Sequence, residues 1–112
     1  MEFYSITESQ TKEFEQNGHI LLRGVAESKE IVRFGPAICA AANKYSTETR
    51  NIEDRDAYGK AFLQITNLWR HDEETKRFVF EPRFAQMAAD LLGVKKVRLY
   101  HDQALLRSRA AA

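Results

Sequence analysis

The sequence predicts an α+β domain, because it carries both helical and strand-like patterns of apolar residues. Apolar residues recur at helical spacing over 82–93 and again over 31–45. Residues 97–107 alternate between two faces that are both partly apolar, which is typical of a strand inside a sheet. The 112 residues suffice for one hydrophobic core. We therefore predict one domain over residues 1–107, followed by a polar and alanine-rich tail, 108–112, that resembles vector-derived sequence.

Composition and charge argue against several classes of protein. Seventeen basic residues against sixteen acidic ones give a net charge of +1, too small for the phosphate attraction behind nonspecific nucleic-acid binding. Hydrophobic residues make up 44% and charged residues 29%, as in ordinary soluble domains. No apolar run approaches the ~20 residues of a membrane span, and the polar start lacks the pattern of a signal peptide. We expect a soluble, cytoplasmic protein with no nucleic-acid or membrane partner.

The first predicted elements are a polar helix and a buried strand. Thr7 and Gln10 have the spacing of a capping box, and Gly18 can end the helix in the left-handed conformation. Residues 19–25 have the length and composition of a buried strand. Its apolar residues are Ile20, Leu21, Leu22 and Val25.

The middle of the chain combines a long helix with two less regular stretches. The helical spacing of 31–45 stays in phase across Gly35 and Pro36, although proline cannot donate to the preceding turn. The helix therefore either kinks at Pro36 or restarts there with Gly35 as its cap. Residues 46–56 are polar and predict an exposed connection, whereas 57–69 predict a packed irregular segment with short helical pieces.

Two further helices and a strand are predicted after residue 71. Acidic residues at 72–74 and basic residues at 76–77 suit the dipole of a short helix. The next helix begins at Pro82 and ends at Gly93. One face of this helix carries Phe84, Met87, Leu91 and Leu92. One face of the last strand carries Val97, Leu99, His101, Gln103, Leu105 and Arg107.

Metal-binding residue types are present without the spacing of a known site. His71 and Asp72 are adjacent, as are His101 and Asp102, and neighbours on a strand or helix point in different directions. A facial iron triad commonly uses His-x-Asp, which does not occur in the chain. We therefore predict no catalytic and no metal-binding residue.

Other conspicuous residues are expected to be structural. Cys39, the only cysteine, lies in an alanine-rich stretch and is predicted to be a small buried residue. His19 is expected at the surface or as a cap. Trp69, Phe62 and Phe84 are expected in the core rather than in a substrate wall.

Three blocks of sequence resemble the phytanoyl-CoA dioxygenase-like family. These are FEQNGHILLRGV at 14–25, FLQITNLW at 62–69, and 77–106, in which RFVF leads through LG into VRLYHDQALL. The resemblance covers nearly the whole chain. It implies a double-stranded β-helix, or jelly roll, with helices packed outside, and oxidation by iron(II), 2-oxoglutarate and dioxygen.

The resemblance also implies roles for individual residues. Family members usually carry a lysine that helps to hold 2-oxoglutarate where this chain has Arg107, and a guanidinium can also bind a carboxylate. His101, Gln103 and Leu105 would line the same substrate pocket. The family's iron ligands are expected after residue 107 and are not in this chain.

We therefore expect the N-terminal part of an oxygenase that hydroxylates a small organic or acyl substrate, with the jelly roll incomplete. This chain alone should be inactive and bind neither iron nor 2-oxoglutarate. The alternative is a self-sufficient α+β interaction module without catalytic activity. In either case the strand 97–106 is expected to favour self-association if its edge lacks a neighbour.

Overall fold

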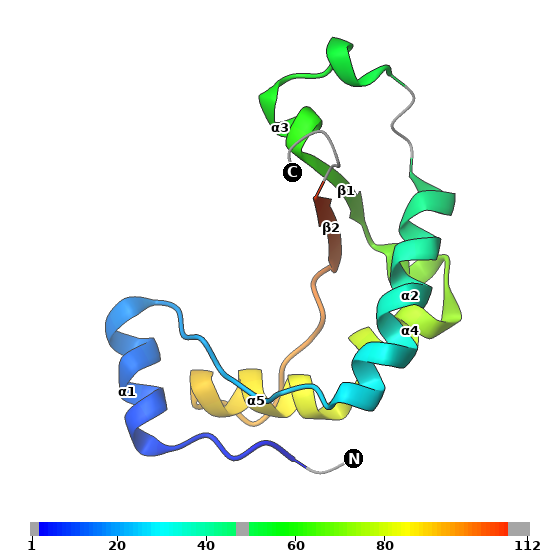
Figure 1. Ribbon diagram of the computed structural model, residues 1–112. Coiled ribbons are helices and arrows are strands. Elements are labelled where there is room, and N and C mark those ends of the chain that lie inside the picture. Colours follow the sequence, from blue (N-terminus) through cyan, green and yellow to red (C-terminus); the bar gives the residue numbers. More distant parts are fainter. Residues whose placement is uncertain (1–2, 47–49, 108–112) are drawn as a thin grey trace.

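The protein has the α+β architecture that its sequence predicts (Figure 1). The computed structural model describes residues 3–46 and 50–107. Its α-helices and strands are α1 (Glu8–Asn17), α2 (Ser28–Tyr45), α3 (Ala57–Ala61), β1 (Phe62–Thr66), α4 (Glu73–Val79), α5 (Pro82–Leu92) and β2 (Gln103–Arg107). Two short 3₁₀ helices, η1 (Ile52–Asp54) and η2 (Leu68–Arg70), complete the order. No helix in these described residues is both long and apolar enough to cross a lipid bilayer.

The first helix begins and ends as predicted. The Thr7 hydroxyl accepts a hydrogen bond from the Gln10 N–H at 3.1 Å, and Gln10 Oε1 accepts one from the Thr7 N–H at 2.8 Å. Gly18 follows with φ at +75°, which is the left-handed conformation that glycine adopts readily. Helix α1 packs against α5 (Figure 1).

The buried strand predicted at 19–25 is wrong. This segment is irregular, and Leu21 is 75% exposed. A strand needs a neighbouring backbone to satisfy its N–H and C=O groups, and no described strand lies beside this segment. Part of it is held by a side chain instead, because the Tyr4 hydroxyl donates to the Arg23 carbonyl at 2.7 Å.

The long helix α2 does not restart at Gly35. It runs without interruption from Ser28 to Tyr45 and includes Pro36. The Glu27 N–H at its start donates to Glu30 Oε1 at 2.9 Å, which satisfies one of the free donors of the first turn. Cys39 lies on the exposed side of this helix, so its predicted burial is wrong. Its helical position, rather than its small size and apolar neighbours, decides its exposure.

The two strands form an antiparallel sheet whose one face packs on α2 (Figure 1). Leu63 lies opposite Leu106 and Ile65 opposite Ala104, so these four side chains share the packed face. This face belongs to the core. The buried residues of the core are Ala41, Ala42, Ile65 and Leu68, and the partly buried residues packed against them are Ile38, Tyr45, Leu63, Ala104 and Leu106. The small alanines of α2 let the helix approach the sheet closely.

Two expectations about strands need correction. The segment 57–69 contains the predicted helical pieces, but also β1, which has no regular alternation to reveal it. The strand predicted over 97–106 is a strand only over Gln103–Arg107. Its pairing is limited by β1, which supplies only five partners, and among the described residues β2 is paired along one edge rather than inside a wider sheet.

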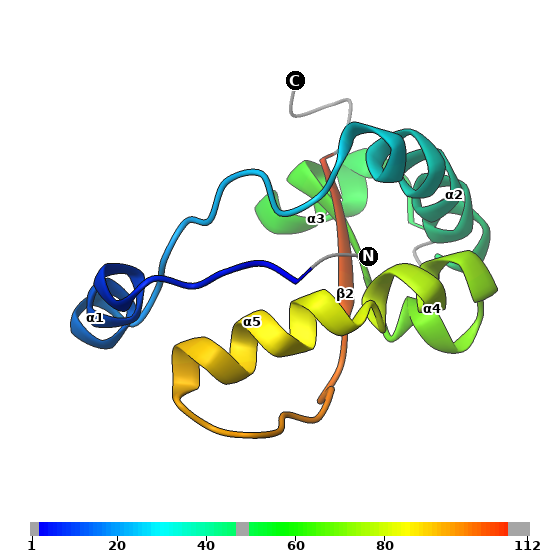
Figure 2. The same ribbon diagram turned by 90° about the horizontal axis from the view of Figure 1, so that it is seen from below.

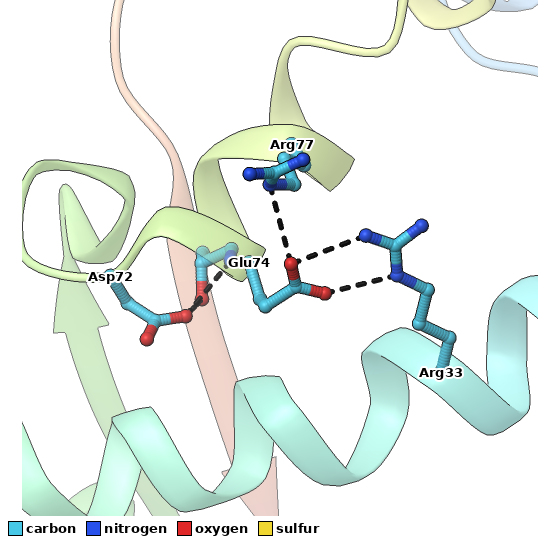
Figure 3. Close-up of polar contacts among 5 residues, drawn as sticks. Arg33, Asp72, Glu74 and Arg77 are labelled. Carbon is cyan, nitrogen blue, oxygen red and sulfur yellow. Dashed lines mark hydrogen bonds and ion pairs between the residues drawn. The ribbon is translucent and has the colours of Figure 1, made fainter.

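Ion pairs join α2 to α4. Glu74 accepts two hydrogen bonds from the Arg33 guanidinium, at 3.0 and 3.2 Å, and lies 3.3 Å from Arg77 (Figure 3). Asp72 caps α4 by accepting from both the N–H and the hydroxyl of Thr75. The predicted arrangement of acid at the start and base at the end of this helix is confirmed.

Helix α5 has the predicted limits, with Pro82 in its first turn and Gly93 after its end at a φ of +69°. Met87 is buried and Phe84 and Leu91 are half-buried, as their spacing predicts. Leu92, however, is 59% exposed, because its neighbour Leu91 takes the inward position at this helix end.

Candidate functional site

The predicted substrate-pocket residues gather mainly on the second face of the sheet. Gln103, Leu105 and Arg107 are exposed and alternate with the half-buried side chains of Ala104 and Leu106. Across the ladder Gln103 lies opposite Thr66 and Leu105 opposite Gln64, both of which are also exposed. The sheet therefore has one face covered by helix and one open face that mixes amide, hydroxyl, aliphatic and guanidinium groups.

One end of this face carries aromatic residues as well. Phe62 lies opposite Arg107, and its ring contacts that of Tyr58 at a centroid distance of 5.4 Å. The Tyr58 hydroxyl and Gln64 Oε1 lie 2.6 Å apart in a hydrogen bond. Tyr58 thus fixes the Gln64 amide on the open face.

His101 is the one predicted pocket residue outside the ladder. It lies in the irregular segment before β2, is exposed, and contacts the Tyr100 ring at 4.7 Å. Three of the four predicted residues therefore share a strand face, while the position of His101 is set by the preceding segment. The arrangement is an open surface and not an enclosed pocket.

Asp102 anchors the start of β2 and was not predicted to have this role. Its carbonyl accepts from the Asn67 N–H at 2.8 Å, and its carboxylate accepts from the Trp69 N–H at 3.5 Å. Asn67 has a φ of +58°, so the chain turns sharply where β1 ends. Asparagine is a common residue in such a conformation, and this is the signal from which the turn could have been found.

The three histidines lie in separate local contacts. His71 stacks on Tyr45 at 5.2 Å, His19 Nδ1 lies 3.1 Å from the Asn17 carbonyl, and His101 contacts Tyr100. Over 3–46 and 50–107, no group of three or more histidine, cysteine, aspartate or glutamate residues could hold a metal ion. The histidine exposed at position 19 agrees with its expected place at the surface.

The perturbed ionisable groups lie in ion pairs between helices and not on the open face. Hydrogen bonds from Arg83 lower the pKa of Glu30, and those from Arg33 lower the pKa of Glu74. In turn, these carboxylates raise the pKa of Arg83 and of Arg33. These shifts therefore reflect charge pairing that joins α2 to α4 and α5, rather than acid–base chemistry.

A groove lies beside α5 and is lined by that helix and by the segment 94–99. This segment runs back from the end of the helix (Figure 2). This groove has a volume of about 870 Å³. Trp69 and Phe80 line it and contact each other edge to face at 5.0 Å. Trp69, Phe62 and Phe84 were expected in the core, yet all three are only half-buried. Sequence spacing did not reveal this groove, because 97–99 was predicted as the start of a strand.

Comparison with protein-family models, curated proteins and solved structures gives no match to this chain.

Proposed function

We propose that this chain is the N-terminal portion of a phytanoyl-CoA dioxygenase-like, iron(II)- and 2-oxoglutarate-dependent oxygenase. The observation that carries the proposal is the two-sided sheet, with helix on one face and a mixed polar face on the other. A jelly-roll oxygenase needs this division, since its helices pack outside and its pocket lies inside. The sequence resemblance over 14–25, 62–69 and 77–106 supplies the family.

On this proposal, Arg107 is the residue of the open face that binds a carboxylate of 2-oxoglutarate. Its guanidinium can donate two parallel hydrogen bonds to a carboxylate, which a lysine ammonium cannot match in geometry. Gln103 and Leu105 stand on the same side of β2 and form the wall beside it. His101 precedes them and extends the wall.

The described residues do not offer a ligand set for iron. The proposed contribution is a scaffold and part of the pocket wall. The family's iron ligands would come from residues that follow these 112. The substrate remains in the broad class of small organic or acyl molecules.

The test is a succinate assay with iron(II), ascorbate and 2-oxoglutarate, applied to this chain and to the product of its complete reading frame. We expect turnover only by the complete product, whose sequence should contain His-x-Asp. Arg107→Gln in that product should raise KM for 2-oxoglutarate roughly tenfold, the loss expected for one charge-assisted contact. Arg23→Gln, which makes the same chemical change at an exposed residue of 19–25, should not.

Turnover by the 112-residue chain above a metal-free control would contradict the proposal. So would a complete product without His-x-Asp and without turnover. That second outcome would favour the other candidate, an α+β interaction module without catalytic activity. The observation favouring a module is the open apolar groove beside α5, because hollows of this kind are common binding sites.

A further inference from the structure

The groove beside α5 is built mostly from apolar side chains. Helix α5 supplies one wall, the segment 94–99 supplies another, and Trp69 and Phe80 add aromatic surface. The apolar lining residues are Trp69, Val79, Phe80, Phe84, Ala85, Ala88, Leu92, Val94, Val97 and Leu99. Its volume of about 870 Å³ falls within the range of roughly 300–1,000 Å³ that is usual for small-molecule sites.

Basic residues outnumber acidic ones in the lining of the groove. Lys96 and Arg98 both line it and are exposed, whereas Glu81 is its only acidic lining residue. Neither Lys96 nor Arg98 forms an ion pair within 3–46 and 50–107. By contrast, Arg83 of α5 is held in a buried pair with Glu30. The groove thus presents two cations beside an apolar wall.

We propose that this groove binds a free amphipathic anion, with an alkyl chain along the apolar wall and a carboxylate at Lys96 and Arg98. The apolar lining favours the chain by removing it from water, and the two cations favour a negative headgroup over a positive or neutral one. The site shares no lining residue with the open face of the sheet, so it stands apart from the proposed oxygenase site.

The groove fits a single free molecule better than a membrane surface. Peripheral membrane binding uses a projecting apolar face flanked by many basic residues, so that side chains enter the lipid. Here many of the apolar residues face a hollow, and only two cations line it. A ligand therefore enters the protein, rather than the protein entering a bilayer.

Trp69 provides the readout, because it is the only tryptophan and lines the groove. We would titrate the 112-residue chain with decanoate below its micellar concentration and follow Trp69 fluorescence. We expect a saturable change with decanoate and a response at least several times weaker with decanol or decyltrimethylammonium. Vesicles of anionic phospholipid should bind no better than vesicles of neutral phospholipid.

Two variants locate the site. Lys96→Gln/Arg98→Gln should weaken decanoate binding roughly tenfold, as expected for two partly exposed charged contacts. The matched control Arg23→Gln/Lys60→Gln loses the same charge at exposed positions outside the groove and should bind as the original chain does. Ala88→Phe should abolish binding by filling the groove, with circular dichroism used to confirm that its helix content is unchanged.

Three results with the soluble probes and the charge variants would overturn the proposal. These are no saturable response to decanoate, equal binding of the cationic and anionic probes, and equal weakening by the groove pair and its control. Binding to anionic vesicles without binding to free decanoate would also overturn it, in favour of a membrane contact. If Ala88→Phe fails to fold, the two charge-matched pairs still decide the outcome.

Discussion

Arg83 and Glu30 form a buried ion pair with two hydrogen bonds, which joins the first turns of α5 and α2. Arg83 Nη1 donates to Glu30 Oε1 at 3.1 Å and Nη2 donates to Oε2 at 2.7 Å. Both side chains are almost fully buried. The pair also supports α2 locally, because Glu30 Oε1 accepts the Glu27 N–H.

We predict that removing one partner of this pair is strongly destabilising. Glu30→Gln leaves the Arg83 charge buried without its counter-charge, and should lower the melting temperature by roughly 10 °C or more. Thermal unfolding followed by circular dichroism measures this. The double variant Glu30→Met/Arg83→Leu should recover much of the loss, because neither charge is then left unpaired. A single variant as stable as the original chain would contradict the prediction.

The lowered pKa values of Glu30 and Glu74 predict loss of stability in acid. Each carboxylate is held below its ordinary pKa of 4.5 by hydrogen bonds from an arginine, so its stabilising effect is present above about pH 4.5. This effect is lost as the pH falls through the lower pKa of the folded state. Urea unfolding between pH 3 and 7 should therefore show a falling midpoint below about pH 4.5.

The two carboxylates can be separated in the same experiment. Glu30→Gln and Glu74→Gln should each reduce the fall of the urea midpoint below about pH 4.5. At neutral pH, Glu74→Gln should cost only a few degrees of melting temperature, because Arg33 and Arg77 remain partly in solvent. If the urea midpoint of Glu30→Gln/Glu74→Gln falls in acid as much as that of the original chain, other groups cause the pH dependence.

Leu68 is predicted to be a critical core residue. It is fully buried beside Ala42 and Ile65, so Leu68→Ala leaves a cavity and should cost about 3 kcal/mol of unfolding free energy. Leu21→Ala removes the same atoms at an exposed position and should stay within about 0.5 kcal/mol of the original chain. Urea unfolding compares them. Equal costs would mean that Leu21 is buried, as its strand-like surroundings had predicted.

Gly93 is expected to lose stability when it is replaced by alanine. An added Cβ would have open space, but the backbone has a φ of +69°, so Gly93→Ala should cost about 1 kcal/mol. Thermal unfolding measures this, and a variant as stable as the original chain would contradict the backbone explanation.

We expect the chain to self-associate through the outer edge of β2. Among the described residues this strand is paired with β1 alone, and Leu105 on it is 52% exposed. Leu105→Lys should shift sedimentation profiles toward monomer across a concentration series. Leu99→Lys, outside the ladder, is the comparison, because an effect of Leu99 alone would place the contact at the groove. A chain that stays monomeric at high concentration would contradict the prediction.

Local sequence signals predicted the ends of α1 and α5, because the residues that set each end lie within a few positions of it. Thr7 and Gln10 form the capping box, Gly18 and Gly93 take the left-handed conformation, and Pro82 opens α5. Each device satisfies or removes an unpaired backbone group at its own helix end. Such devices can be recognised without knowing what lies across the molecule.

Strands and exposed faces depended on partners distant in sequence. Residues 19–25 are strand-like in composition but have no described strand beside them, whereas β1 is not alternating and becomes a strand by pairing with β2. The open face was partly predictable, since Gln103, Leu105 and Arg107 share a side by alternation alone. The position of His101 was not, because the regular strand begins after it.

By itself the sequence determined the α+β class, the limits of α1 and α5, and the shared side of Gln103, Leu105 and Arg107. Those features follow from backbone capping and from the two-residue repeat of a strand. Only the tertiary structure decided the extent of the sheet, the buried Glu30–Arg83 pair and the groove beside α5. Each of these joins residues that are far apart in the chain, and their free energy exists only once the fold has brought them together.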